Sequence, residues 1–248
     1  MSDPLVKIDY RNSPSVNHIK KKILSSSITL GEIAVIKAGV KMYEKGKGEP
    51  PQNDEIIENQ PYSKKGICPK GWQPLYRGKD VNRYYLLIPT EFVNYGIHLA
   101  APRNIELFES PKILMRRTDD KLVSTLESDS AICVNSCHVI KLKKEFIQAY
   151  SYEFILGLLN SQLMQYIFEI QNPQMVDKIF AEVKVVYVER LPIPTAGEGD
   201  RAAIESLAQK CLDAKGQNVK QWEQEIDAIV ARLYGLSEDE MKIVLNTD

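Results

Sequence analysis

The sequence predicts an α+β fold, in which a twisted, mostly antiparallel β-rich domain with flanking helices is followed by a helical C-terminal arm. Two observations predict this class. Between residues 84 and 142, short runs rich in β-branched and aromatic residues alternate with turn-forming residues. After Pro194, apolar residues recur at helical spacing instead. We therefore expect a β-rich domain over residues 1–195 and a helical arm over residues 196–248.

The N-terminal part predicts one helix, one strand and a long loop. Val16, Ile19 and Ile23 recur at helical spacing after a Ser-Pro pair, which favours a short opening helix. Residues 30–40 form an apolar run that predicts a strand ending at a glycine. Residues 44–71 contain many lysines and few large apolar side chains, so we expect a long loop, and long loops inside compact domains commonly have a function.

The middle of the chain predicts strands, and then an amphipathic helix over residues 154–170. The predicted strands span residues 84–88, 112–117, 122–126, 131–142 and 183–188. The tract Glu189-Arg190-Leu191-Pro192-Ile193-Pro194 follows the last of them. Each of its prolines lacks the amide donor that a central strand needs, so the tract predicts the end of a strand.

The helical arm is predicted from its caps as much as from its periodicity. The predicted caps are Asp200 and Gly216 for the first helix, Asn218, Gln221 and Gly235 for the second, and Ser237 with Glu240 for a short third one.

Charge is distributed unevenly along the chain. Residues 1–146 contain 23 Lys and Arg against 17 Asp and Glu, a net charge of +6. Residues 147–248 contain 9 against 16, a net charge of −7. Such asymmetry is typical of a protein in which one half faces a polyanion and the other a partner or solvent. Ordinary scatter also produces an excess of this size, so charge alone does not decide.

Several function classes are not favoured. No N-terminal stretch resembles a signal peptide, and residues 154–170 contain too many polar side chains to span a bilayer. The four cysteines are irregularly spaced, so we expect a reduced, cytoplasmic protein without disulfides. Cys133, Cys137 and His138 lack the second ligand pair of a structural zinc site. Both thiols are predicted to lie on one face of a strand, facing inward.

Catalytic signatures are incomplete. No strand–Gly-x-Gly–helix unit is present to hold a cofactor, and Asn172-Pro173-Gln174-Met175 lacks the aromatic ring with which a DNA methyltransferase stacks on a flipped base. Asp177, Glu182 and Lys184 offer the residue types of a metal-dependent nuclease, but Asp177 lies too close in sequence to occupy a separate strand. His138 is expected to be packed. We predict no catalytic residue, no metal ligand and no cofactor; a small nuclease with an unrecognised site stays open.

Binding residues are easier to find. Arg77, Lys79 and Arg83 cluster around Gly78, a residue that permits close backbone approach or a positive φ, and Asp80 is expected to orient one of the cations. The aromatic neighbours of this basic turn are Trp72, Tyr76, Tyr84 and Tyr85. Arginine pairs bidentately with guanine in the major groove, whereas lysine neutralises phosphates. An exposed basic turn beside buried tyrosines would show the same residues.

Two further clusters are candidates for DNA contacts. Lys112 and Arg116 would share one face of a strand while Arg117 takes the other, so at most two of the three would reach DNA, and Arg117 could pair with a carboxylate instead. The other cluster is suited to phosphate contacts. It consists of Lys41, Tyr43, Lys45 and Lys47.

Four tracts together resemble a known family. They are Gln73-Pro74-Leu75-Tyr76-Arg77-Gly78-Lys79-Asp80-Val81, Glu109-Ser110-Pro111-Lys112-Ile113-Leu114-Met115-Arg116-Arg117-Thr118, Ile155-Leu156-Gly157-Leu158-Leu159-Asn160-Ser161 and the strand-like run with its proline tract that ends at Pro194. In this order they resemble the TaqI-like C-terminal specificity domain of type II and IIG restriction–modification enzymes, which is related to type I specificity subunits. The resemblance covers most of the chain.

The resemblance implies sequence-specific recognition of double-stranded DNA. Full-length members of the family join such a domain to a methyltransferase, sometimes with a nuclease. It therefore implies a methyltransferase or endonuclease domain or subunit as a partner, with the helical arm as the docking element, and this chain as either a fragment or a separate subunit. A protein-interaction module with an incidentally basic half remains the other alternative.

Overall fold

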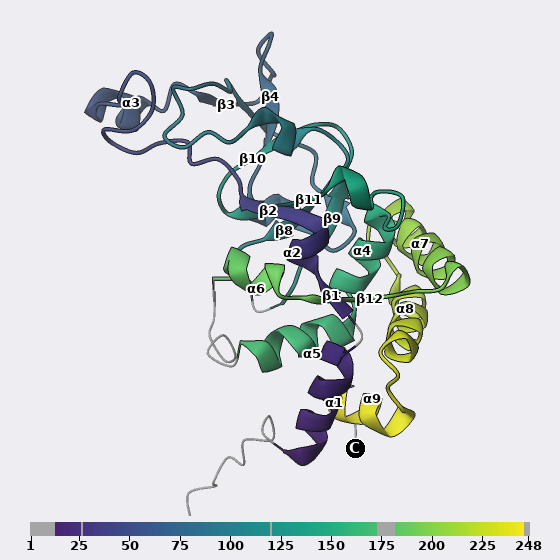
Figure 1. Ribbon diagram of the computed structural model, residues 1–248. Coiled ribbons are helices and arrows are strands. Elements are labelled where there is room, and N and C mark those ends of the chain that lie inside the picture. The colour runs from purple at the N-terminus through teal and green to yellow at the C-terminus, as the bar shows by residue number, and fades with distance from the viewer. Residues whose placement is uncertain (1–12, 26, 120, 173–181, 246–248) are drawn as a thin grey trace, which may run out of the picture.

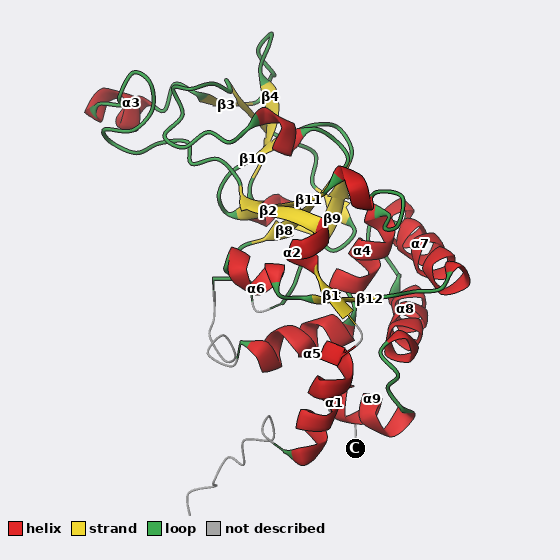
Figure 2. Ribbon diagram, viewed as in Figure 1, coloured by secondary structure: helices red, strands yellow, loops and turns green. Residues whose placement is uncertain are grey.

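The computed structural model describes residues 13–25, 27–119, 121–172 and 182–245. Helices and mostly antiparallel sheets share one elongated molecule, which confirms the predicted α+β class (Figures 1 and 2). A small lobe with α3, β3 and β4 lies at one end, a four-stranded sheet lies in the middle, and helices gather at the other end.

The central sheet consists of β2 (Ala34–Ala38), β11 (Cys137–Leu142), β8 (Lys112–Arg116) and β9 (Ser124–Glu127), in that order and antiparallel throughout. β8, β9 and β11 are largely buried on both faces, whereas the edge strand β2 exposes Val35 and Lys37 on one face. Ile113 and Met115 of β8 pack in the larger hydrophobic core, whereas Leu114 between them packs in a smaller one. Successive side chains of a strand point to opposite faces, so a sheet between two cores gives apolar runs without alternation.

The smaller core lies between the central sheet and a second sheet. The second sheet consists of β10 (Ile132–Cys133), β4 (Gln73–Tyr76), β7 (Glu91–Val93) and β3 (Ser63–Lys65), in that order. β10 runs parallel to β4, and the other pairs are antiparallel. A short hairpin of β5 (Val81–Asn82) and β6 (Tyr85–Leu86) lies against β8 and β9 of the central sheet. Buried Leu75, Val93 and Phe108 fill the space between the sheets.

The larger core is covered by helices. They are α1 (Pro14–Ser25), α2 (Leu30–Ile33), α4 (Tyr152–Leu159), α5 (Gln162–Gln171), α6 (Val185–Glu189), α7 (Glu198–Asp213), α8 (Lys220–Leu233) and α9 (Glu238–Leu245). α4 and α7 approach closely at Gly157, where a Cβ atom would lie 2.6 Å from Ile204 Cγ2. Because Ile204 and Val230 of the arm share this core with Ile155, the arm packs as part of the same body. The boundary at residue 195 stays a prediction.

Several of the predicted helix and strand boundaries differ from the structure. The apolar run from Leu30 begins with the helical turn α2, capped by Thr29 and Glu32, and only then continues as β2. The helix predicted over residues 154–170 is two helices, and Ser161 caps the second by accepting a hydrogen bond from Met164 N at 3.1 Å. Residues 44–71 are ordered: they include α3 (Asp54–Asn59) and β3, and the buried Gln52 amide donates to Met42 O at 3.0 Å.

Two predictions near the proline tract are wrong. Val185–Glu189 forms the helix α6, although its β-branched residues favour a strand, because tertiary packing outweighs weak β propensity. The tract that we predicted to end a strand contains the strand β12 (Pro192–Pro194). It pairs with β1 (Ser27–Thr29) in a two-stranded ribbon, whose outer edge tolerates prolines.

The other sequence expectations can be compared directly. Cys133 and Cys137 are both buried, but they occupy the separate strands β10 and β11. Ser237 and Glu240 form the predicted cap, with Glu240 accepting a hydrogen bond from Ser237 N at 2.7 Å. The first arm helix starts after Gly197 instead of at Asp200. No helix in the described ranges is long and apolar enough to cross a membrane.

One buried ion pair joins β8 to the edge strand β9 of the central sheet. Lys112 has 0% of its side chain exposed, lies directly across from Glu127 in the β8–β9 register, and pairs with it. Lys112 Nζ also donates to Phe108 O at 2.7 Å. The Glu127 carboxylate accepts the backbone amides of Asp129 at 2.7 Å and Ala131 at 3.3 Å. Lys112 therefore neutralises a buried carboxylate and cannot contact DNA, which corrects its prediction as a binding residue.

We predict that Lys112→Met destabilises the protein by about 3–5 kcal/mol, because the Glu127 carboxylate would remain buried without its counter-ion. The double variant Lys112→Met/Glu127→Gln should recover part of this loss, since the glutamine carbonyl is neutral and still accepts the backbone amides. Urea unfolding measures both, with the exposed Lys37→Met in β2 as a matched control. A loss below about 1 kcal/mol for Lys112→Met would contradict the burial of this lysine.

Candidate nucleic-acid interface

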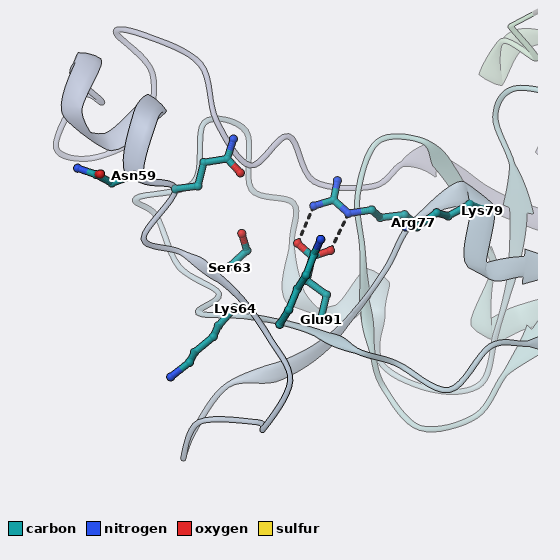
Figure 3. A pocket seen from close by; sticks show the side chains of 8 residues that line it. Asn59, Ser63, Lys64, Arg77, Lys79 and Glu91 are labelled. Carbon is teal, nitrogen blue, oxygen red and sulfur yellow. Dashed lines mark hydrogen bonds and ion pairs between the residues drawn. The ribbon is translucent and has the colours of Figure 1, made fainter.

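A polar cleft of about 310 Å³ opens on the small lobe (Figure 3). One side is formed by the end of α3 and by β3, and the other by the turn after β4 and by the first residue of β7. Its lining residues are Asn59, Gln60, Ser63, Lys64, Lys65, Arg77, Lys79 and Glu91. Four of these eight side chains are basic and one is acidic, so the cleft favours an anionic ligand.

Arg77 is held in place by Glu91. Arg77 Nε donates to Glu91 Oε2 and Arg77 Nη2 to Glu91 Oε1, both at 2.7 Å. Glu91 has only 12% of its side chain exposed, whereas Arg77 has 38%. The hydrogen bonds from Arg77 hold the pKa of Glu91 below its usual value, against the effect of burial. The pair uses one edge of the guanidinium group, and the N–H groups on Nη1 and the second N–H on Nη2 can still donate to a ligand.

Asp80 does not orient a cation of the basic turn, as we had expected, but stabilises the backbone of the turn. Asp80 accepts a hydrogen bond from the backbone N–H of Arg77 at 2.7 Å, so it shapes the turn backbone, and Glu91 orients the cation. Gly78 donates to Ser136 Oγ at 2.9 Å, and a Cβ atom on it would lie 2.7 Å from Ser136 O. The close approach that requires glycine is therefore made to the protein's own chain.

Three lysines surround Arg77 in the cleft. Lys64 and Lys65 lie on β3, and Lys79 lies in the turn after β4; all three are exposed. None of them has an ion-pair partner within the described part of the chain. Sequence reasoning found Lys79 but missed Lys64 and Lys65, because residues 44–71 were treated as a loop. Two adjacent lysines at the start of a turn were the only available signal.

The predicted cluster of Lys41, Lys45 and Lys47 lies on the segment between β2 and α3, and two of its lysines form ion pairs. Lys41 pairs with Glu44 at 2.9 Å, and Lys45 pairs with Asp54 at 2.7 Å. Lys47 is exposed. These pairs lie at the surface, where such contacts are weak enough to be exchanged for a phosphate.

Tyr43 packs against Tyr62 and Ser63, at the start of β3. Its hydroxyl oxygen accepts the backbone N–H of Tyr62 at 2.8 Å, and its ring stacks on that of Tyr62 with centroids 5.8 Å apart. Burial raises the pKa of Tyr43. Tyr43 therefore positions the start of β3, and its role at a DNA interface stays a prediction.

The remaining predicted arginines lie outside the cleft and connect segments of the chain. Arg83 donates to Asn160 O at 2.7 Å and pairs with Glu223 of α8. The partners of Arg116 are Asp119 at 2.8 Å, Asn82 Oδ1 at 3.0 Å and Val81 O. Arg117 pairs with Glu182 at 2.6 Å and donates to Asn135 O at 2.8 Å. The structure thus does not bring these three together with Arg77.

The catalytic candidates gain no support. Glu182 pairs with Arg117, which lowers the pKa of its carboxyl, and Asp177 lies outside the described residues, as does most of the tract that begins at Asn172. Over residues 13–25, 27–119, 121–172 and 182–245, no three His, Cys, Asp or Glu side chains are grouped to hold a metal ion. His138 is buried, its Nε2 contacts Val183 O, and burial lowers its pKa. It is packed, as predicted.

Comparison with known proteins identifies the domain. Residues 73–193 match the model of the TaqI-like C-terminal specificity domain. No curated protein sequence matches the chain. Among solved structures, the Type IIL restriction-modification enzyme MmeI, determined in complex with DNA, matches with a TM-score of 0.51 and 11% identity over 90% of this chain and 36% of that one.

Two type I structures give lower scores. The HsdS subunit from Thermoanaerobacter tengcongensis matches with a TM-score of 0.45 and 10% identity over 89% of this chain and 50% of its own. The type I S subunit from M. genitalium matches with a TM-score of 0.37 and 15% identity over 92% of this chain and 48% of its own. This chain therefore spans half or less of the structures it matches.

The match identifies residues 73–193 as a TaqI-like C-terminal specificity domain, a domain of restriction–modification enzymes. The matched segment includes Arg77, Lys79 and Glu91, and the β3 side of the cleft lies just before it.

We predict that Glu91→Gln lowers the free energy of unfolding by about 1–2 kcal/mol at neutral pH, since it weakens a charge-assisted pair of which one partner is half-exposed. Because Arg77 holds the pKa of Glu91 below 4.5, this stabilisation is present above that pH and is lost as the pH falls below it. Thermal unfolding of both proteins between pH 3 and 7 measures the difference.

The exposed Glu55→Gln in α3 is the control for that series. A difference between wild type and Glu91→Gln that is the same at pH 3 and pH 7 would show that the Arg77–Glu91 charge pair does not stabilise the fold.

Proposed function

We propose that this chain recognises a specific sequence in double-stranded DNA, as the specificity part of a restriction–modification enzyme. The observation that carries the proposal is the cleft, in which Glu91 orients Arg77 among three exposed lysines. When a carboxylate fixes one edge of a guanidinium group, the other edge points in a defined direction. A bidentate contact with guanine O6 and N7 requires such a fixed orientation.

We assign different roles to the lysines and to the arginine of the cleft. Lys64, Lys65 and Lys79 suit phosphate contacts, because an ammonium group on a flexible stem neutralises charge without reading sequence. Arg77 is suited to base recognition for the reason given above. Lys47 and its neighbours in the adjoining loop would extend the phosphate contacts along the duplex.

The partner that this function requires is a methyltransferase or endonuclease domain or subunit, as in a type IIG enzyme. The chain spans 36% of MmeI, so such an activity would be supplied by other residues. We infer that the helices α7, α8 and α9 dock this partner, since they lie away from the small lobe that carries the cleft (Figure 1). DNA in the bacterial cytoplasm is the expected substrate.

We predict that Lys64→Ala, Lys65→Ala, Lys79→Ala and Lys47→Ala each weaken binding to all duplexes alike. Each should also lower the slope of log affinity against log salt by about one unit, because one phosphate contact is lost. Fluorescence anisotropy over a salt series measures both quantities. Lys210→Ala, in an exposed position on α7, is the matched control. An affinity of wild type that does not depend on salt would favour a protein-interaction module instead.

We predict that Arg77→Ala removes about 1–3 kcal/mol of discrimination at one base pair while retaining most non-specific binding. Arg77→Lys should not restore the preference, since a point charge lacks the guanidinium fork. Binding-site selection from random duplexes gives the profile, and melting temperature reports on folding. If Arg77→Ala lowers the melting temperature but selects the same sequences as wild type, Arg77 is structural and the reading residues lie elsewhere.

A further inference from the structure

Gln60 ends α3 in a backbone conformation that glycine would adopt more easily. Its φ is 47° and its ψ is 54°, in the left-handed region. The conformation is held at both ends, because Gln60 N donates to Ile56 O at 3.0 Å and Gln60 O accepts from Ser63 N at 3.4 Å. A Cβ atom is unfavourable in this region, so the backbone alone does not explain a glutamine here.

The side chain of Gln60 is available to a ligand. Gln60 is exposed and lines the cleft that also contains Arg77. Its amide makes no side-chain hydrogen bond to any other described residue. The neighbouring Asn59 offers the same chemistry, but its side chain points away from the Arg77–Glu91 pair (Figure 3). A non-glycine residue in a left-handed conformation strains the backbone. When its polar side chain also lines a binding cleft, the residue is a candidate for function.

The chemistry of an amide selects one base. A glutamine donates to adenine N7 and accepts from adenine N6 at the same time, and no other single base presents both an acceptor and a donor on its major-groove edge. We propose that Gln60 reads an adenine in the same target sequence in which Arg77 reads a guanine. This assignment rests on the proposed function, because it requires that the cleft binds duplex DNA.

The test is binding-site selection from random duplexes with wild type, Gln60→Gly and Gln60→Glu. Gln60→Gly retains the left-handed backbone and removes only the amide, so its melting temperature should equal or exceed that of wild type. It should lose a preference for adenine of about tenfold or more at one position and keep the guanine that Arg77 selects. Gln60→Glu should favour cytosine at that position, because a carboxylate accepts from cytosine N4 and cannot donate.

The outcomes separate this assignment from the function on which it rests. A wild-type profile without any enriched sequence would overturn both. An enriched wild-type sequence that Gln60→Gly also selects unchanged would overturn the Gln60 assignment alone. Uniformly weaker binding by Gln60→Gly, with an unchanged profile, would show that the amide contacts a phosphate and would overturn the assignment in the same way.

Discussion

Burial of β8 on both faces of the central sheet is the constraint on which the other parts of the structure depend. β8 directs Ile113 and Met115 into the larger core and Leu114 into the smaller one, so each face needs its own cover. Helices cover one face and the β10-β4-β7-β3 sheet covers the other. The same burial removes the Lys112 side chain from water. A fully buried ammonium group requires a counter-ion, and Glu127, directly opposite on β9, supplies it.

The two cores also separate two kinds of surface. The cleft depends on the second sheet, where Arg77 directly follows β4 and the adjacent β7 begins with Glu91. The helices of the arm belong to the larger core. Under the proposed function, DNA reading and partner docking therefore rely on different hydrophobic clusters on the two sides of the central sheet. Changes in the helical arm can then alter assembly without reshaping the cleft.

The four predicted arginines show how one residue type takes different roles. Arg77 is oriented by Glu91 inside a cleft, whereas Arg83 and Arg117 connect segments through Glu223 and Glu182. In sequence, all belong to basic clusters near glycine or strand ends. What distinguishes Arg77, Arg83 and Arg117 is the position of a carboxylate that lies 14, 140 or 65 residues away along the chain. No local pattern contains that information.

The sequence by itself determined the α+β class, the opening helix, the strands β8, β9 and β11, the helices of the arm, the family and the basic turn at Arg77, because periodicity, caps and short motifs are local. Only the tertiary structure decided that Val185–Glu189 is helical and that Pro192–Pro194 forms a strand with β1. It also buried Lys112 and placed Gln60 and Lys65 beside Arg77. These outcomes depend on contacts between distant segments, whose packing energies exceed the weak preferences of short runs.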